Sequence, residues 1–221
     1  MARTDFDRDL KLLQDDLMFM GSMVEKAISR SLQALERRDI ALSRQVIEED
    51  DLIDAKASEI EDKCIDLIAM QQPLAGDLRI LITVLQVSVE LERMGDYAEG
   101  IGKIGVAIGD DPLLKPLIDL PRMGELAGRM LRRSLEALIS RNVEDALEVI
   151  KSDDAVDLLY EQVYRELLLF MIEDPSTVKR ATYLLWVSHD LERIADRATN
   201  VAERAIFLVT GSMPEEEASN Y

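Results

Sequence analysis

The sequence is poor in the residues that mark several common protein classes. Its 221 residues include one cysteine, one histidine, six prolines and ten glycines, and only 5% are aromatic. The single cysteine, Cys64, excludes an intrachain disulfide, and its apolar neighbours predict a small core residue. The N-terminal segment lacks the apolar stretch of a secretion signal, and no apolar run is long enough to cross a bilayer. These absences favour a cytoplasmic protein without direct membrane insertion.

Basic residues are also scarce relative to acidic ones. The chain carries 26 Lys and Arg residues against 44 Asp and Glu residues, which gives a formal net charge of −18. A surface of this sign repels nucleic acid and anionic lipid headgroups, so we expect neither as a ligand. Such a protein is suited to cations or to the basic surfaces of partner proteins.

The common signatures of nucleotide binding and nucleophilic catalysis are missing. The sequence has no Walker-type phosphate loop and no dinucleotide-binding glycine motif. It also lacks the Glu-x-x-His pairs of the di-iron carboxylate bundles. A catalytic triad would have to use His189, and nothing near this residue indicates an activated nucleophile. We therefore predict that the protein is not an enzyme.

Helix-forming residues are abundant. Hydrophobic residues make up 48% of the chain, and they recur every three or four positions almost throughout. Prolines at 73 and 175 mark helix boundaries, because proline fits the first turn of a helix better than its interior. The spacing of Trp186 and of the methionines predicts core positions for these residues.

The two halves of the chain repeat each other. Residues 31–35 (SLQAL) correspond to 134–138 (SLEAL), and residues 46–51 (VIEEDD) correspond to 149–154 (VIKSDD). A period of about 100 residues is too long for a solenoid and indicates a duplicated domain. Each copy contains three helical segments, so we predict an all-α fold of two tandem three-helix bundles related by pseudo-twofold symmetry. The predicted parts are a first bundle (1–109), a linker (110–121), a second bundle (122–211) and a disordered acidic tail (212–221).

The third helical segment of each copy carries a row of acidic residues. Glu92, Asp96 and Glu99 are spaced by four and seven positions and therefore share one helix face, and Glu192, Asp196 and Glu203 do so in the second copy. Like charges at positions i and i+4 destabilise an isolated helix by about 0.2–0.5 kcal/mol per pair. Repulsion in both copies indicates a bound cation, and oxygen ligands suit hard cations such as Mg, Mn, Ca or ferric iron.

A second interpretation is that these rows are plain solvated surface. Acidic residues four positions apart occur by chance in a protein of this charge, and Arg93, Arg193 or Arg197 could neutralise them. His189 likewise has two interpretations. It stands three residues before Glu192 and within reach of the second acidic row, but a lone histidine beside an apolar stripe is more often a hydrogen-bonded boundary residue.

The middle helical segments supply further candidates. The set Asp50, Asp51 and Asp54 is mirrored by Asp153, Asp154 and Asp157. If each middle segment packs beside the third, these carboxylates could complete a metal site. A solvated acidic face is the alternative, and it is the favoured interpretation for Asp51 and Asp154.

Two sequence runs resemble a known family. Residues 73–79 (PLAGDLR) followed by 91–96 (LERMGD) are similar to the first repeat of the PhoU family of phosphate-uptake regulators. Residues 191–200 (LERIADRATN) are similar to the second repeat, and the likeness extends over about residues 4–211. This sequence departs from the pattern at Gly100, which occupies the position of Asn200, so the first site is expected to use a different ligand set.

The resemblance implies more than the residues do by themselves. Members of the family fold as two three-helix bundles and bind metals, including multinuclear iron or zinc clusters. The resemblance further implies a protein that represses the phosphate-starvation response and links the ATPase subunit of a phosphate ABC transporter to a membrane sensor histidine kinase. By position, the resemblance implies that Glu92, Asp96, Glu192 and Asp196 are metal ligands and that Asn200 fills the last polar place of the motif. A homodimer is also compatible with the resemblance.

These observations lead to one preferred function and two alternatives. The preferred function is a metal-binding negative regulator of phosphate transport and phosphate-starvation signalling, which binds iron, with zinc, manganese and magnesium as alternatives. The alternatives are a metalloenzyme with an open carboxylate site and a helical adaptor that works without metal. The predicted metal ligands are Asp50, Asp54, Glu92, Asp96, Glu99, Asp153, Asp157, Glu192, Asp196, Asn200 and Glu203.

Overall fold

The computed structural model describes residues 3–214, and every regular element in that range is helical. Because apolar residues recur at the helical period, each long helix buries one stripe and exposes the rest. The elements are α1 (Arg3–Arg37), α2 (Ile40–Gln71), α3 (Ala75–Ile108), α4 (Asp119–Ser140), α5 (Val143–Ser152), α6 (Asp154–Glu173), the short 3₁₀ helix η1 (Pro175–Thr177) and α7 (Val178–Thr210).

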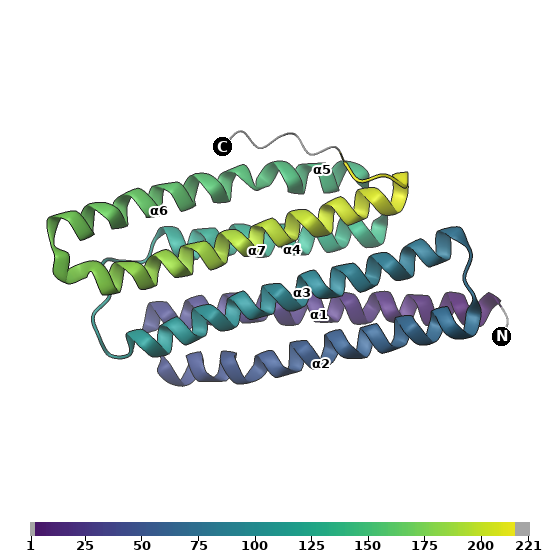
Figure 1. Cartoon of the computed structure of the whole chain (residues 1–221), viewed down its shortest axis with the longest axis horizontal. Coiled ribbons are helices and arrows are strands. Elements are labelled where there is room, and N and C mark those ends of the chain that lie inside the picture. The colour runs from purple at the N-terminus through teal and green to yellow at the C-terminus, as the bar shows by residue number, and fades with distance from the viewer. Residues whose placement is uncertain (1–2, 215–221) are drawn as a thin grey trace.

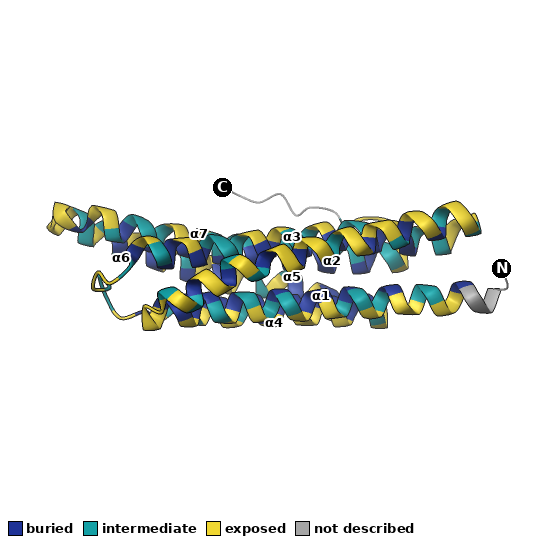
Figure 2. Ribbon diagram, turned by 90° about the horizontal axis from the view of Figure 1, so that it is seen from below, coloured by how far each residue is buried: buried dark blue, intermediate teal, exposed yellow. Residues whose placement is uncertain are grey.

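The helices form two three-helix bundles that lie side by side, as Figure 1 shows. Helices α1–α3 make the first bundle, and α4, α5 with α6, and α7 make the second. Figure 2 shows two layers, with α1 and α4 in one and α2, α3, α6 and α7 in the other. Across the boundary α3 packs on α7 and α1 on α4, and the apolar core runs through both bundles.

The pairing of helices across the boundary is antiparallel. On α1, Gly21 faces Leu135 of α4, whereas Leu32, further along α1, faces the earlier Gly124 of α4. The same order reversal relates α3 to α7, where Glu90 meets Asn200 and the later Gly100 faces the earlier Asp190. Antiparallel pairing of equivalent helices is what a twofold axis across the helices produces, so the predicted pseudo-symmetric fold is confirmed.

The two copies also share their helix caps. The Asp39 side chain accepts a hydrogen bond from the Leu42 amide at the start of α2, at 2.9 Å. At the equivalent point of the second copy, the Asn142 side chain accepts from the Glu144 and Asp145 amides. Such caps satisfy backbone N–H groups that have no partner inside the helix. They fix both tight turns that lead into the middle helices.

Three sequence-based expectations need correction. The predicted linker 110–121 is too long, because α4 already begins at Asp119 and accommodates Pro121 in its first turn. The middle segment of the second copy is not one continuous helix, because it is interrupted at Asp153, between α5 and α6. Trp186 is not a core residue, because its side chain is 54% exposed and packs its edge on Tyr183.

Other expectations agree with the structure or fall outside it. Cys64 is fully buried, as predicted. Within residues 3–214 no helix is long and apolar enough to span a membrane. The predicted acidic tail 212–221 lies, from residue 215 onward, outside the described residues.

Candidate metal centres

Five carboxylates meet where α2 packs on α3. We call them the first cluster, which consists of Asp50, Asp54, Glu92, Asp96 and Glu99. Carboxylate oxygens of Asp50, Asp96 and Glu99 lie within 4.8 Å of one another, and those of Asp54, Glu92 and Asp96 do so as well. Asp96 belongs to both groups, so it would be a ligand whichever group held a cation.

Glycines on α3 allow α2 to approach this closely. A Cβ atom at Gly95 would lie 2.9 Å from Oδ1 of Asp50, and one at Gly102 would lie 3.2 Å from the carbonyl oxygen of Ser43. Both distances are shorter than ordinary contacts, so the absence of side chains at these two positions brings the α2 carboxylates onto α3. The small residues that the sequence places on α3 therefore help to build the first cluster.

Asp50 is the buried member of the first cluster. Its residue surface is only 9% exposed. Burial, followed by the charges of Asp54, Glu99 and Asp96, raises the pKa of its carboxyl to about 7. Among its described neighbours, the Lys103 ammonium favours the charged form, but this lysine already pairs with Glu99. An ionised Asp50 thus lacks a counter-ion of its own.

The remaining carboxylates of the first cluster lie nearer the solvent. Burial, followed by the charges of neighbouring carboxylates, raises the pKa of Glu92 and of Asp96. Asp54 lies on the exposed side of α2 and completes the group with these two residues. The cluster is therefore open to solvent on one side and closed by Asp50 on the other.

The second copy places four carboxylates near the packing of α6 on α7, where their charges act on one another. This second cluster consists of Asp153, Asp157, Glu192 and Asp196. Unlike in the first cluster, no three of these residues bring ligand atoms within 4.8 Å of one another in the described range. The Asp153 carboxyl has its pKa raised to about 7 by burial and then by the charges of the other three members. Burial raises the pKa of Glu192 to about 7 as well. Oδ1 of Asp153 and Oε2 of Glu192 are enclosed by the protein, and neither finds a hydrogen-bond partner in the described range.

The second cluster already contains nitrogen groups. The Arg193 guanidinium donates to Oδ2 of Asp196 at 2.8 Å. Nδ1 of His189 lies 3.5 Å from Oε2 of Glu192. The predicted neutralisation by arginine is therefore present in part: Arg193 binds Asp196 directly, and its charge also acts to lower the pKa of Glu192.

Two predicted ligands are not members of either cluster. The Asn200 side chain donates to Oε2 of Glu90 on α3, at 3.2 Å, and so lies at the boundary between the bundles. Glu203 lies on α7 two turns beyond Asp196. The other nine predicted ligands are the members of the two clusters.

Glu90 stands two residues before Glu92 on α3 and was not singled out by the sequence analysis. The Oε2 atom of Glu90 accepts hydrogen bonds from the Asn200 side chain and from Nη1 of Arg197, the latter at 3.3 Å. The side chains of Glu90 and Arg197 are both largely buried. The equivalent residue of the second copy, Asp190, faces Gly100 instead, and burial raises its pKa to about 7. The sequence did contain a signal for this contact. Gly100 stands where the second copy has Asn200, so the first copy has no side chain there to donate a hydrogen bond to Asp190.

Glu90→Ala should loosen the contact between the bundles. It leaves the buried Arg197 and Asn200 groups without their acceptor, which costs about 1–3 kcal/mol of unfolding free energy and lowers the melting temperature by about 3–10 °C. Thermal unfolding followed by circular dichroism measures this change. Glu61→Ala, which removes an exposed glutamate from α2, is the matched control and should stay within about 0.5 kcal/mol. Equal melting temperatures for the two variants would contradict the assignment.

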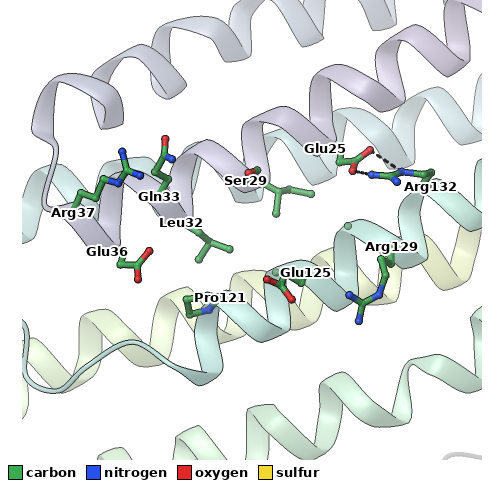
Figure 3. Close-up of a pocket in the computed structure, with 13 residues that line it drawn as sticks. Glu25, Ser29, Leu32, Gln33, Glu36, Arg37, Pro121, Glu125, Arg129 and Arg132 are labelled. Atoms are coloured by element: carbon green, nitrogen blue, oxygen red, sulfur yellow. Dashed lines mark hydrogen bonds and ion pairs between the residues drawn. The ribbon is translucent and has the colours of Figure 1, made fainter.

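A pocket lies between α1 and α4, in the layer that does not contain the two clusters (Figure 3). Ile28 and Leu32 contribute apolar surface to it, and charged side chains of both signs surround it. Glu25 and Arg132 form an ion pair across one end. Within the described range no group of three potential metal ligands lies in this pocket, whereas both groups that meet the distance criterion belong to the first cluster in the other layer.

Comparison with known proteins gives a consistent result. The model of the PhoU domain matches residues 17–105 and 120–205. A protein of Clostridium acetobutylicum, named phosphate-specific transport system accessory protein PhoU homolog, is 43% identical over 212 residues, covering 96% of this chain and 97% of the relative. The crystal structure of PhoU from Pseudomonas aeruginosa superposes with a TM-score of 0.89 at 32% identity, covering 94% of this chain and 100% of that one. The phosphate transport system regulatory protein PhoU from Streptococcus pneumoniae gives a TM-score of 0.87 at 30% identity over 94% of this chain and 98% of that one.

Proposed function

Because this chain belongs to the PhoU family, we propose that it is a metal-binding negative regulator of phosphate transport and of phosphate-starvation signalling. Membership of the family supports a role as an accessory protein of phosphate transport, because the relatives are named as accessory or regulatory proteins. The finer proposal is that it acts in the cytoplasm, without catalysis, between the ATPase subunit of a phosphate ABC transporter and a sensor histidine kinase.

The observation that carries metal binding is the buried carboxylate of Asp50. It faces Asp96 and Glu99 and lacks a counter-ion of its own. The enclosed oxygens of Asp153 and Glu192 repeat this situation in the second cluster. Such groups are costly to bury unless they are protonated or bound to a cation, so the residues present fit metal ions. Iron is the proposed metal, with zinc, manganese and magnesium as alternatives.

The two clusters connect the metal to the shape of the protein. A bound cation supplies the positive charge that these carboxylates lack. Asp50 and Asp54 would hold it from α2, and Glu92, Asp96 and Glu99 would hold it from α3. Asp153 and Asp157 would act with Glu192 and Asp196 in the same way. Ligands on two helices fix the position of one helix against the other, so we propose that metal binding sets the helical surface that the partners recognise.

Elemental analysis of the purified protein tests this proposal. The wild type should contain metal, and a variant with Glu92→Ala, Asp96→Ala, Glu192→Ala and Asp196→Ala should lose it while its circular dichroism stays helical. A control variant, Asp51→Ala with Asp154→Ala, removes exposed acidic residues beside the clusters and should keep the metal.

A partner assay then separates regulation from metal binding. Binding to the transporter ATPase subunit should weaken when the metal is removed from the wild type by a chelator. If the wild type takes up none of Fe, Zn, Mn and Mg, metal binding is rejected and the metal-independent adaptor remains. Unchanged partner binding after metal removal would reject the proposed role of the metal in recognition.

A further inference from the structure

The two clusters differ in one residue that can change which metal they select. Position 189 on α7 corresponds to position 89 on α3, since both stand two residues before the shared Leu-Glu-Arg sequence. His189 occupies it in the second copy and Val89 in the first. We infer that His189 is a nitrogen ligand of the second cluster, which therefore prefers borderline transition cations such as Zn²⁺, while the first cluster binds hard cations through oxygen alone. This inference rests on the proposed metal binding.

The contacts of His189 place it at the second cluster. Its Nδ1 atom is 3.5 Å from Oε2 of Glu192, the oxygen that is enclosed without a hydrogen-bond partner among the described residues. The Tyr160 ring of α6 packs on the imidazole, with ring centres 6.4 Å apart. One side of the imidazole is therefore supported by α6 while the other meets the α7 carboxylate.

The separation of these two atoms suits a shared metal ion. A good hydrogen bond would bring nitrogen and oxygen to about 2.7–3.2 Å, so 3.5 Å is long for that purpose. Two ligand atoms that each lie about 2.0–2.1 Å from a tetrahedral ion are separated by about 3.4 Å. His189 is also 55% exposed along its side chain, so small rotations can complete the coordination.

Nothing equivalent exists in the first cluster. Val89 is 49% exposed and has no donor atom. Both three-carboxylate groups of the first cluster consist of oxygen ligands, which suit Mg²⁺ or Mn²⁺. An imidazole shifts preference toward zinc and similar ions.

Each cluster contains a basic side chain that pairs with one of its carboxylates. Arg193 donates to Asp196 in the second cluster, and Lys103 pairs with Glu99 in the first. The ion pairs therefore do not distinguish the two clusters, whereas the imidazole of His189 does. A metal that forms a bond to the His189 nitrogen gains an interaction with which Arg193 does not compete.

Two exchanged variants test the inference on the full chain. His189→Gln removes the imidazole and keeps a polar side chain, and Val89→His places an imidazole at the matching position of the first cluster. Zn²⁺ and Mn²⁺ affinities are measured on metal-free protein by competition with a chromophoric chelator, and circular dichroism verifies folding. The absorption spectrum of the Co²⁺-loaded protein reports on nitrogen ligation independently.

His189→Gln should weaken one class of Zn²⁺ sites by about 10–100-fold or more and leave Mn²⁺ binding unchanged. Val89→His should strengthen Zn²⁺ binding at the first cluster. Wild-type Zn²⁺ affinity in a folded His189→Gln variant, or an equal loss of Zn²⁺ and Mn²⁺, would overturn the inference and leave the proposed metal binding intact. Failure of the wild type to bind either ion would reject the proposed metal binding itself.

Discussion

Asp50→Asn should make the metal-free protein more stable and, at the same time, abolish cation binding by the deepest group of the first cluster. The Asp50 carboxyl is 9% exposed, and its pKa is raised to about 7 by burial and then by three neighbouring carboxylates. A neutral amide of the same size removes the cost of burying a charge. A shift of this size corresponds to about 2–4 kcal/mol of unfolding free energy near neutral pH, or about 5–15 °C in melting temperature.

The sign of the pH dependence follows from the raised pKa. Between the ordinary pKa of 3.8 and the folded value of about 7, the native state holds a proton that the unfolded state has lost. Raising the pH through this window therefore destabilises the wild type but not, through this residue, the Asn variant. The stability difference should be small near pH 4, grow up to about pH 7 and then stay constant. Thermal unfolding at a series of pH values, with a chelator present, measures it.

Asp51→Asn is the matched control for Asp50→Asn. It makes the same chemical change one residue along α2, where the side chain is exposed, so it should alter stability by less than about 0.5 kcal/mol and keep the metal. The claim that the buried charge of Asp50 lowers stability is wrong if Asp50→Asn destabilises the metal-free protein at pH 8, or if its effect is the same at every pH.

Gly95→Ala should weaken metal binding at the first cluster by about 10–100-fold. The added methyl would lie 2.9 Å from Oδ1 of Asp50 and 3.2 Å from two carbon atoms of Ile53. The carboxylate has to turn away or α2 has to move out, and either response separates Asp50 from Asp96. Overpacking lowers the free energy of unfolding by about 1–3 kcal/mol, and the higher helix propensity of alanine raises it by about 1 kcal/mol. The effect on stability should therefore be smaller than the effect on affinity.

Gly76→Ala provides the comparison for Gly95→Ala. A Cβ atom at Gly76, in the first turn of α3, meets nothing within 4 Å, so this variant should keep its metal affinity and be unchanged or slightly more stable. Mn²⁺ titration of both variants distinguishes them. Retention of wild-type Mn²⁺ affinity by a folded Gly95→Ala protein would contradict the role of the close approach of α2 to α3.

The sequence alone was sufficient for the architecture and for recognising which candidate ligands share a helix face. Helical periodicity and proline positions are local properties, and the repeat of one half in the other is written directly in the residues, so the two three-helix bundles were predictable. Spacing of four along a helix also places Glu92 beside Asp96 whatever the tertiary structure is. For the same reason the acidic rows of both third helices could be recognised.

Only the tertiary structure decided which carboxylates meet and what each of them faces. The rotation of each helix about its axis and the approach of α2 to α3 bury Asp50 and leave Asp51 in solvent. Packing of α7 on α3 brings the Asn200 side chain to Glu90 of the other bundle. These outcomes depend on contacts between residues 45 to 110 positions apart in the chain, and no local pattern specifies such contacts. Helical spacing determines which residues share a face, whereas helix packing determines what that face meets.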